Sequence, residues 1–558
     1  MDGPALGRAS TAPPAAEGCA GPSARPRGLA PRLVVLGWDS ATWDVADPLV
    51  AEGRLPVLGD LIERGFRAPL RSVWPPMTDC AWTSAFTGTN PGRHGIFGSW
   101  YRAPGAYACR YFSSRDRKVP GLWEMGARDI RWLVWNVPMT FPPTPVTGAM
   151  VAGYGAPPGA DITSPPELGA SLGQRFRLDD LLDRAPHGSL ERFLDELLRG
   201  LEAQAEALPW AAERTGAHCV VAVWPHIDRA QHFFWRFRGT DHPLADAVER
   251  VYTAMDRATG NLLGAWPEAD VMVVSDHGAG PLRSDVNLGS WLAGQGYASY
   301  GRPRRRSPVN LAWALPSPVR RLGKRLAPGL ARRAVGATLT GQLGSFDWSD
   351  TQAFVGVHGD LWLNLAGREP LGCVAAQDAP ELLDELRDRI GGLEDPGTGE
   401  RLFAGVHARD EIYSGPQSAN APDLMLDGWS TGYRVAPGRE ASEATLIAPV
   451  PLSGVREAWS ADHRPLGILA AAGPRIARGD APELALLDVC PTALALLEQP
   501  VPEGLDGRVA TELVDAGWLR AHPVRAGAPV TARDAAGGYS AEEADSVAAH
   551  LKDLGYIE

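Results

Sequence analysis

Three apolar runs in this sequence each lead into an aspartate, and this arrangement constrains the fold more than any other feature. The pairs are Arg32–Gly37 with Asp39, Cys219–Trp224 with Asp228, and Val271–Ser275 with Asp276. Continuous apolar runs of this length are typical of buried parallel strands, and open α/β sheets place their ligands at the carboxyl ends of such strands. The pattern therefore predicts strand ends that carry carboxylates toward a common site.

Helix-like segments separate the apolar runs. Apolar residues recur at helical spacing in 48–65, 190–208 and 244–263, and Trp132–Trp135 adds another strand candidate. This alternation of strands and helices favours a parallel or mixed sheet covered by helices on both faces. We therefore predict an α/β protein built as a three-layer α/β/α sandwich.

The length of the chain predicts more than one structural unit, because 558 residues exceed what one hydrophobic core usually organises. We expect a disordered tail at 1–30, a catalytic core at 31–278 and 460–519, an inserted cap or lid at 279–459, and a peripheral segment at 520–558. Shorter elements are expected at Leu361–Asn364 (strand), Leu466–Ala471 (return to the core), Asp488–Leu497 (last core helix) and 541–554 (terminal helix).

The composition is that of an ordinary globular protein, with 44% hydrophobic and 22% charged residues. No run approaches the roughly 20 apolar residues of a membrane-spanning helix, and the first thirty residues contain no apolar block like that of a signal peptide. The six cysteines are far apart and form no CxxC pair. We therefore expect a cytoplasmic protein with neither a disulfide framework nor a thiolate zinc site.

The net charge of -12 gives the chain no general attraction to nucleic acid, so specific nucleic-acid recognition is not expected. One local exception is the segment 302–333, which carries ten Arg and Lys residues and no acidic residue. A solvated basic helix and loop is one interpretation. Peripheral contact with a polyanionic substrate or an anionic membrane surface is the other.

Histidines accompany the aspartates near the predicted strand ends. Asp228 and His232 would share one face of a helix, Asp276 and His277 precede Gly278 in a turn, and His463 lies in a late Asp-His-Arg-Pro motif. Each motif alone is ordinary. Together, oxygen and imidazole ligands from several strand ends can hold two divalent cations about 3.5–4 Å apart, as in phosphoryl-transfer sites.

These motifs resemble those of the type I phosphodiesterase/nucleotide pyrophosphatase family of the alkaline phosphatase superfamily. The segments that carry the resemblance are Leu36–Asp39, Pro75–Ile96, Asp228–His232, Ser275–Gly278, Asp462–Pro465, Asp488–Thr492 and Leu505–Gly507. The resemblance implies a two-metal hydrolase that cleaves phosphodiester or phosphoanhydride bonds of a small-molecule phosphate ester or nucleotide-like substrate. The metals would be zinc, with manganese as the alternative.

The resemblance also assigns residues to roles. Asp228, His232 and His463 would hold one zinc, and Asp39, Asp276 and His277 would hold the other together with Thr78. Thr78 would be the nucleophile and form a covalent phosphothreonine, because coordination to a divalent cation favours an alkoxide. Thr83 and Ser84 are rival hydroxyls. Trp82 is a candidate for stacking on the substrate.

Two departures from related patterns bear on the substrate. No Asn occurs between Thr78 and Thr89, where many nucleotide pyrophosphatases use an Asn amide on the phosphoryl group, which weakens the case for nucleotides. Cys80 lacks the Pro and Arg that follow the sulfatase nucleophile, so a buried thiol is expected. His94 is expected to be a structural turn residue.

Three alternatives stay open. A phosphomonoesterase or phosphonate-bond hydrolase could use the same metals, with arginines of the cap holding the dianion. A non-catalytic polyanion- or membrane-binding protein on this fold is an alternative from another class. A transferase like the phosphoglycerate mutases that share the fold would use a Ser nucleophile and other ligands.

Overall fold

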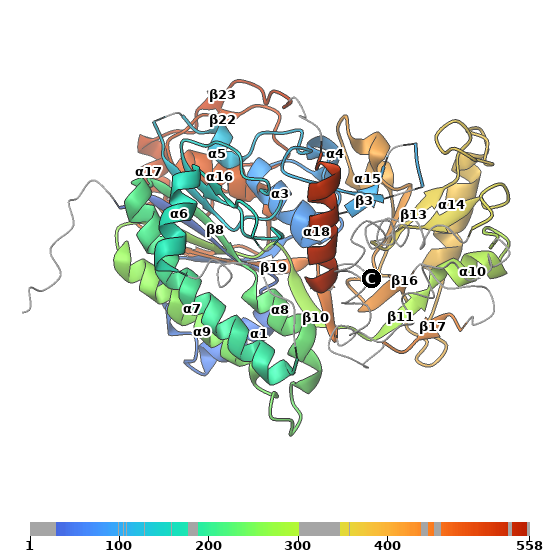
Figure 1. The fold of residues 1–558 in the computed structure, drawn as a ribbon, viewed down its shortest axis with the longest axis horizontal. Coiled ribbons are helices and arrows are strands. Elements are labelled where there is room, and N and C mark those ends of the chain that lie inside the picture. The colour runs from blue at the N-terminus through green and yellow to red at the C-terminus, as the bar shows by residue number, and fades with distance from the viewer. Residues whose placement is uncertain are drawn as a thin grey trace, which may run out of the picture.

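The computed structural model describes residues 30–98, 100–103, 105–107, 109–127, 129–157, 159–176, 188–300, 346–356, 358–436, 445–450, 459–533 and 538–554. These residues form a larger lobe around one wide sheet and a smaller lobe beside it (Figure 1). The predicted tail 1–30 lies almost wholly outside the described residues, and the basic segment 302–333 lies entirely outside them.

The larger lobe is built on a 10-stranded mixed sheet within the described residues. Its parallel centre has the order β9 (Asp270–Val274), β1 (Leu33–Trp38), β8 (Cys219–Trp224), β5 (Trp132–Trp135) and β6 (Gly148–Val151). On the β9 side follow β19 (Leu466–Ala472), antiparallel to both neighbours, then β2 (Phe66–Arg71) with β20 (Gly479–Asp480) and β21 (Leu484–Ala485). Antiparallel β7 (Thr163–Ser164) closes the other edge.

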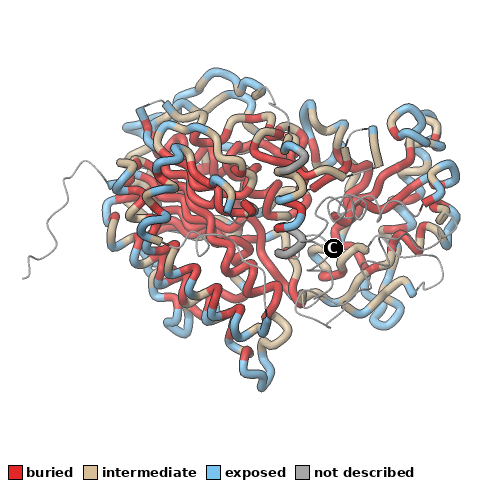
Figure 2. Tube along the Cα trace, in the orientation of Figure 1, coloured by how far each residue is buried: buried red, intermediate tan, exposed pale blue. Residues whose placement is uncertain are grey.

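Helices cover both faces of the sheet, which confirms the predicted three-layer sandwich (Figure 1). One layer consists of α1 (Trp43–Ala51), α2 (Pro56–Arg64), α7 (Leu190–Thr215), α8 (His226–Phe234) with η2 (Trp235–Phe237), and α9 (Ala247–Ala265). The other contains α3 (Thr78–Thr87), α4 (Pro91–His94), α5 (Leu122–Met125) and η4 (Leu486–Asp488) with α16 (Val489–Leu496). Helix α6 (Pro166–Arg175) packs on edge strand β7. The strands of the sheet are buried along their central length (Figure 2).

The smaller lobe has its own cluster of buried apolar residues, separate from that of the sheet. Its strands are β11 (Ser284–Asn287), β16 (Tyr433–Ala436) and β17 (Ile447–Ala448) in one sheet, and β12 (Ala353–Val355), β13 (Asp360–Leu363), β15 (Leu424–Leu426) and β14 (Val406–Ala408) in another. Its helices are α10 (Leu288–Gly294), α14 (Ala379–Gly391), α15 (Arg409–Ile412) and η3 (Ser418–Asn420).

Within the part of the chain that the structure describes, two ribbons connect the lobes. β10 (Gly278–Pro281) pairs antiparallel with β18 (Ala461–Arg464), so the chain enters and leaves the smaller lobe through one two-stranded ribbon. The second ribbon joins β3 (Trp100–Arg102) and β4 (Cys109–Tyr111). Its Trp100 is buried in the core of the larger lobe and its Tyr101 in that of the smaller lobe, as the alternation of side chains along a strand requires.

The predicted strands and helices are confirmed with one difference. The helical pattern of 48–65 is two helices, because α1 ends at Ala51 and Pro56 begins α2, where its fixed φ and missing N–H are tolerated. The predicted domain boundaries stay a prediction. The cluster of the smaller lobe also includes Ile96, Phe97, Tyr101 and Phe112, which lie outside the predicted insertion.

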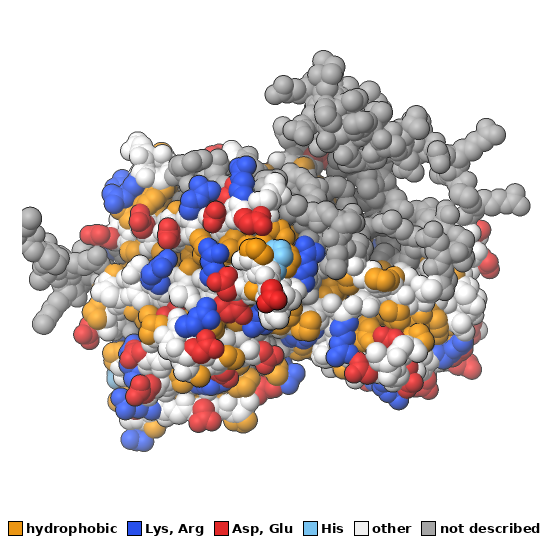
Figure 3. Space-filling model, turned by 90° about the horizontal axis from the view of Figure 1, so that it is seen from below, with side chains coloured by type: hydrophobic (Ala, Val, Ile, Leu, Met, Phe, Trp, Pro, Cys, Tyr) orange, Lys and Arg blue, Asp and Glu red, His pale blue; other side chains and the backbone are white. Residues whose placement is uncertain are grey.

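The C-terminal region adds α17 (Ala516–Ala521), the short pair β22 (Val501–Pro502) and β23 (Ala526–Gly527), and α18 (Ala541–Leu554). Helix α18 buries Val547 and Ala548 against the core of the larger lobe. Searching the described residues finds no helix with the length and apolarity that a membrane crossing demands. On the face shown in Figure 3, acidic and basic side chains are interspersed over the larger lobe.

Candidate metal centre and nucleophile

The carboxyl ends of the central strands meet at one edge of the sheet, where the predicted aspartates lie. Asp39 directly follows β1, Asp276 follows β9, and Asp228 lies in the first turn of α8, which follows β8. All three side chains are buried, with at most 1% of the residue exposed. The sheet order β9-β1-β8 places these segments side by side.

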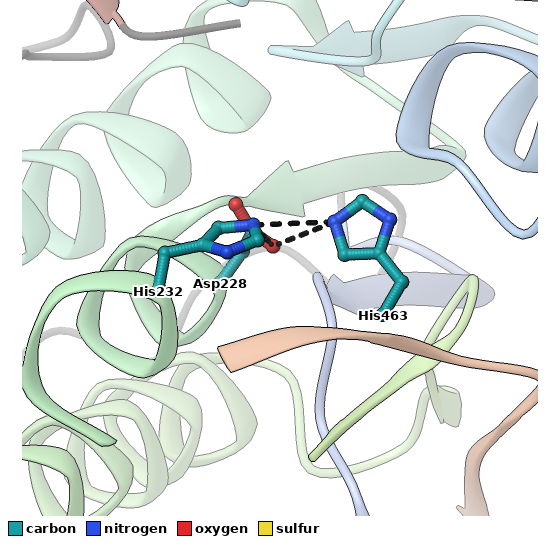
Figure 4. A group of neighbouring side chains, drawn as sticks. All are labelled: Asp228, His232 and His463. Carbon is teal, nitrogen blue, oxygen red and sulfur yellow. Dashed lines mark hydrogen bonds and ion pairs between the residues drawn. The ribbon is translucent and has the colours of Figure 1, made fainter. Parts of the chain in front are cut away.

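Asp228, His232 and His463 form a first ligand group (Figure 4). Helix α8 presents Asp228 and His232 on one face, as their spacing predicts, with Oδ1 of Asp228 3.1 Å from Nε2 of His232. His463 approaches from β18, its Nε2 3.6 Å from the same oxygen and 3.2 Å from Nε2 of His232. One potential ligand atom of each residue lies within 4.8 Å of the others.

Asp39, Asp276 and His277 form a second ligand group with the same 4.8 Å limit between ligand atoms. Nε2 of His277 lies 3.1 Å from Oδ2 of Asp276 and 3.9 Å from Oδ1 of Asp39. The two groups adjoin, because the rings of His277 and His463 stack with centroids 3.8 Å apart. Thr78, the first residue of α3, places its Oγ1 3.4 Å from Nε2 of His277.

The imidazoles are oriented by backbone carbonyls. Nδ1 of His232 donates to Ala461 O at 2.9 Å, Nδ1 of His463 donates to Pro76 O at 2.9 Å, and Nδ1 of His277 faces Gly278 O at 3.1 Å. These partners are acceptors only, so they place the proton on Nδ1 and leave an Nε2 lone pair on each neutral ring. Such Nδ1 contacts are how proteins orient histidine ligands toward a metal.

The carboxylates have oxygen atoms without hydrogen-bond partners. Within the described residues, Oδ1 of Asp39, both oxygens of Asp228 and Oδ2 of Asp276 are buried and accept no hydrogen bond. Buried carboxylate oxygens are costly without a donor or a cation. Because the neighbouring imidazoles also turn lone pairs inward, cations satisfy this set of atoms better than further protein donors would. The residues present therefore fit two metal ions.

The electrostatics agree with this interpretation. Burial, followed by the charges of Asp276 and Asp228, raises the pKa of Asp39 well above its usual range. Burial lowers the pKa of His277, and the neighbouring His463 adds to this effect, so the ring is held neutral as a ligand must be. Burial raises the pKa of Asp228, but positive charge on His232 and His463 outweighs it and holds the pKa well below its usual range, and a bound cation would act in the same direction.

The prediction that Trp82 binds substrate stays a prediction, and its side chain is fully buried. Its indole Nε1 donates to Oδ2 of Asp39 at 3.1 Å, and its ring stacks on Phe86. A Cβ at Gly37 would lie 2.5 Å from the Trp82 ring, so glycine at that position allows the indole to reach the carboxylate. Trp82 thus orients a candidate ligand.

The rival hydroxyls are engaged elsewhere. Thr83 Oγ1 donates to Asp79 O at 2.6 Å, and Ser84 Oγ lies 2.8 Å from Nε2 of His94. Cys80 is a buried free thiol whose Sγ donates to Pro75 O and Met77 O, as expected for a residue that packs beside the site. Of the candidate nucleophiles, Thr78 is the one that faces a ligand group.

Gly278 also serves the packing of the sheet. It begins β10, and a Cβ there would lie 2.1 Å from Leu466 O. Glycine is required because β19 passes so close. Sequence reasoning also missed Trp459, whose ring stacks on His232 with centroids 3.8 Å apart. No motif marks this tryptophan, since it contacts the ligand only in the folded chain.

Comparison with known families identifies the chain. The sequence profile of the type I phosphodiesterase / nucleotide pyrophosphatase family matches residues 33–444, well over half of the protein. The chain belongs to this family. Membership confirms that the protein is a hydrolytic enzyme of the phosphodiesterase and nucleotide pyrophosphatase type.

Solved structures of family enzymes and of a related hydrolase are similar at low sequence identity. Murine ectonucleotide pyrophosphatase/phosphodiesterase 5 shares 12% identity over 87% of this chain and 100% of its own, with a TM-score of 0.45. An inactive variant of the same enzyme bound to AMP gives 12% and 0.46 over the same shares. Phosphonoacetate hydrolase from Sinorhizobium meliloti, bound to phosphonoformate, gives 16% and 0.46 over 82% of this chain and 94% of its own. Among curated proteins, no sequence matches.

Proposed function

We propose that the protein hydrolyses phosphodiester or phosphoanhydride bonds at two metal ions, with Thr78 as the nucleophile. The observation that carries the proposal is the pair of buried ligand groups, Asp228/His232/His463 and Asp39/Asp276/His277, with the Thr78 hydroxyl beside the second. Bound zinc or manganese would supply Lewis acidity and charge neutralisation for a phosphoryl group. The carboxylate and imidazole groups favour divalent ions that accept oxygen and nitrogen ligands.

Charge balance supports Thr78 in this role. Three carboxylates and a deprotonated Thr78 carry four negative charges, which two divalent cations neutralise within a buried site. The threonine hydroxyl would lose its proton to solvent, and Oγ1 would attack phosphorus in line with the leaving alcohol or phosphate, which would take up a proton as it departs. A water molecule would then hydrolyse the phosphothreonine and restore the hydroxyl.

Helix α3 offers binding groups for the phosphoryl oxygens in place of the missing Asn. Thr78 begins the helix, and the first backbone bond of this turn runs from Ala81 N to Met77 O. The N–H groups of the first helical turn therefore have no partner within the helix, and helix N-termini favour anions. A phosphoryl group attached to Thr78 Oγ1 would lie directly at this helix end.

The test compares four p-nitrophenyl substrates with purified enzyme of known metal content. These are bis(p-nitrophenyl) phosphate, p-nitrophenyl thymidine monophosphate, p-nitrophenyl phosphate and p-nitrophenyl sulfate. We expect about two divalent ions per chain, diester cleavage that chelation abolishes, and a loss of about 10³-fold or more in kcat/KM for Thr78→Ala. Thr83→Ala is the matched control and should retain activity, because its hydroxyl is bonded to the helix backbone.

Each other outcome has a clear meaning. Two metals with cleavage of the monoester alone would replace the diesterase proposal by the phosphomonoesterase alternative. If Thr78→Ala were fully active and Thr83→Ala inactive, Thr83 would be assigned as the nucleophile in place of Thr78. A purified chain that binds no metal and cleaves nothing would favour a binding protein on this fold.

A further inference from the structure

Helix α8 reaches both ligand groups through different side chains. Asp228 and His232 lie on the face of α8 that forms the first group. Gln231, between them in sequence, is 1% exposed and points instead toward the turn after β1 that carries Asp39. One helix therefore contacts the first group directly and the second group through an intermediate.

Ser40 is that intermediate. The side-chain amide of Gln231 donates to Ser40 O at 2.8 Å and lies 3.2 Å from Ser40 Oγ. The backbone N–H of Ser40 in turn donates to Oδ1 of Asp276 at 3.2 Å. This hydrogen bond holds Oδ1 of Asp276, while the other oxygen, Oδ2, lies 3.1 Å from Nε2 of His277. The position of Ser40 thus sets the orientation of a candidate metal ligand.

The backbone of Ser40 is in an unfavourable conformation. Its φ of 66° lies in the left-handed region, which non-glycine residues seldom adopt and which persists where surrounding contacts determine it. Gln231 is itself fixed by the Tyr252 hydroxyl, which donates to its Oε1 at 3.2 Å and accepts from Thr42 N at 3.0 Å. Ser40 and Thr42, which follow Asp39, are therefore held by one buried polar network of Gln231 and Tyr252.

We propose that Gln231 is a positioning residue that couples the two metal-binding groups, by holding Ser40 in its left-handed conformation so that Asp276 is oriented for its ion. The inference rests on the proposed function. Binding at the first group orders α8, and α8 then orders Ser40 and Asp276. Since the coupling is energetic, binding at the second group must favour binding at the first by the same factor.

The experiment measures zinc affinity at each group by competition with a chromogenic chelator. Asp228→Asn weakens zinc binding at the first group, so that the affinity of the second group can be measured. Asp276→Asn weakens the second group, so that the affinity of the first can be measured. On the Asp228→Asn background, Gln231→Leu should lower the zinc affinity of the second group by about 10-fold or more, the usual effect of removing a partner that orients a ligand. On the Asp276→Asn background, where the second group no longer contributes through the coupling, Gln231→Leu should leave the zinc affinity of the first group within about 3-fold.

The decisive variant is Gln231→Leu combined with Ser40→Gly. Glycine adopts positive φ as readily as negative φ and keeps the N–H that Asp276 needs. If Gln231 acts by holding Ser40, glycine at position 40 should restore at least half of the lost affinity on a logarithmic scale. If the double variant binds zinc at the second group as weakly as Gln231→Leu alone, the proposal is overturned. An equal loss of zinc affinity at both groups also overturns it, because that result would indicate general loosening of α8.

Failure of this inference can be separated from failure of the proposed function. If the wild-type chain binds no zinc at either group, the two-metal function fails. If it binds two ions and cleaves diesters while Gln231→Leu changes neither affinity, the function stands and the coupling is wrong. Thermal unfolding of each apoprotein identifies any variant whose loss of affinity comes from misfolding.

Discussion

Asp39 depends on a single indole for its orientation. Oδ2 accepts from Nε1 of Trp82 at 3.1 Å, while Oδ1 is buried without a hydrogen-bond partner among the described residues. A carboxylate with one fixed oxygen and one open oxygen is suited to a metal ligand, because the fixed oxygen sets the direction of the open one. Trp82 should therefore affect metal affinity through Asp39.

Replacing Trp82 by Phe tests this role. The change removes the hydrogen bond to Asp39 but keeps an aromatic ring, so zinc affinity of the Asp39/Asp276/His277 group should fall by about 10- to 100-fold. Phe86→Leu is the control, because Phe86 stacks on Trp82 and contacts no candidate ligand. It should lower stability but keep zinc affinity. Equal zinc affinities in Trp82→Phe and wild type, measured by chelator competition, would contradict the role.

The contact between α3 and α4 shows how a neighbouring element stabilises the helix that begins with Thr78. Nδ1 of His94, in α4, accepts from Ile96 N at 3.1 Å, so the proton of the neutral ring is on Nε2, which faces Ser84 Oγ at 2.8 Å. Burial, together with the charge of Arg117, lowers the pKa of His94 to about 3. Protonation would require Nδ1 to become a donor against the Ile96 N–H.

This pKa predicts a loss of stability in acid. Below the usual pKa of 6.5, the unfolded chain binds a proton at His94 that the folded chain excludes until about pH 3, so stability falls as the pH decreases through that window. Between pH 7 and 5 the loss from this residue amounts to about 2 kcal/mol. We expect urea unfolding at pH 7 and pH 5 to show a loss of unfolding free energy in both proteins. The loss should be about 2 kcal/mol larger in wild type than in His94→Gln. Identical losses in the two proteins would refute the assignment.

The elements that carry strong local signals were predictable. Buried strands β1, β5 and β8 and the ligand pair on α8 follow from apolar runs and an i, i+4 spacing that depend on few residues. Contacts between distant segments were not. Neither the indole of Trp82 on Asp39 nor the ring of Trp459 on His232 has a sequence signal, because each arises from packing that brings together unrelated parts of the chain.

At the scale of the whole molecule, the ligand groups join both lobes. His463 lies on β18, which pairs with β10 at Ala279 in the ribbon that leads into the smaller lobe. The other five ligands come from segments around the large sheet. An ion bound at the first group would therefore attach this ribbon to α8 of the larger lobe. The sequence did not reveal that coupling, since the ribbon pairs residues separated by the whole insertion.

Metal removal should therefore loosen the ribbon before it loosens either core. With zinc at about 1,000 times its Kd, the folded protein gains about 4 kcal/mol, and the gain should be largest where ligands fix the backbone. Hydrogen exchange with and without chelator should show faster exchange of the β10 and β18 amides in the metal-free protein. The β12–β13 pair of the smaller lobe, which carries no ligand, is the internal control and should exchange at the same rate in both states. Unchanged protection of β10 and β18 would show that His463 does not connect the lobes through a metal.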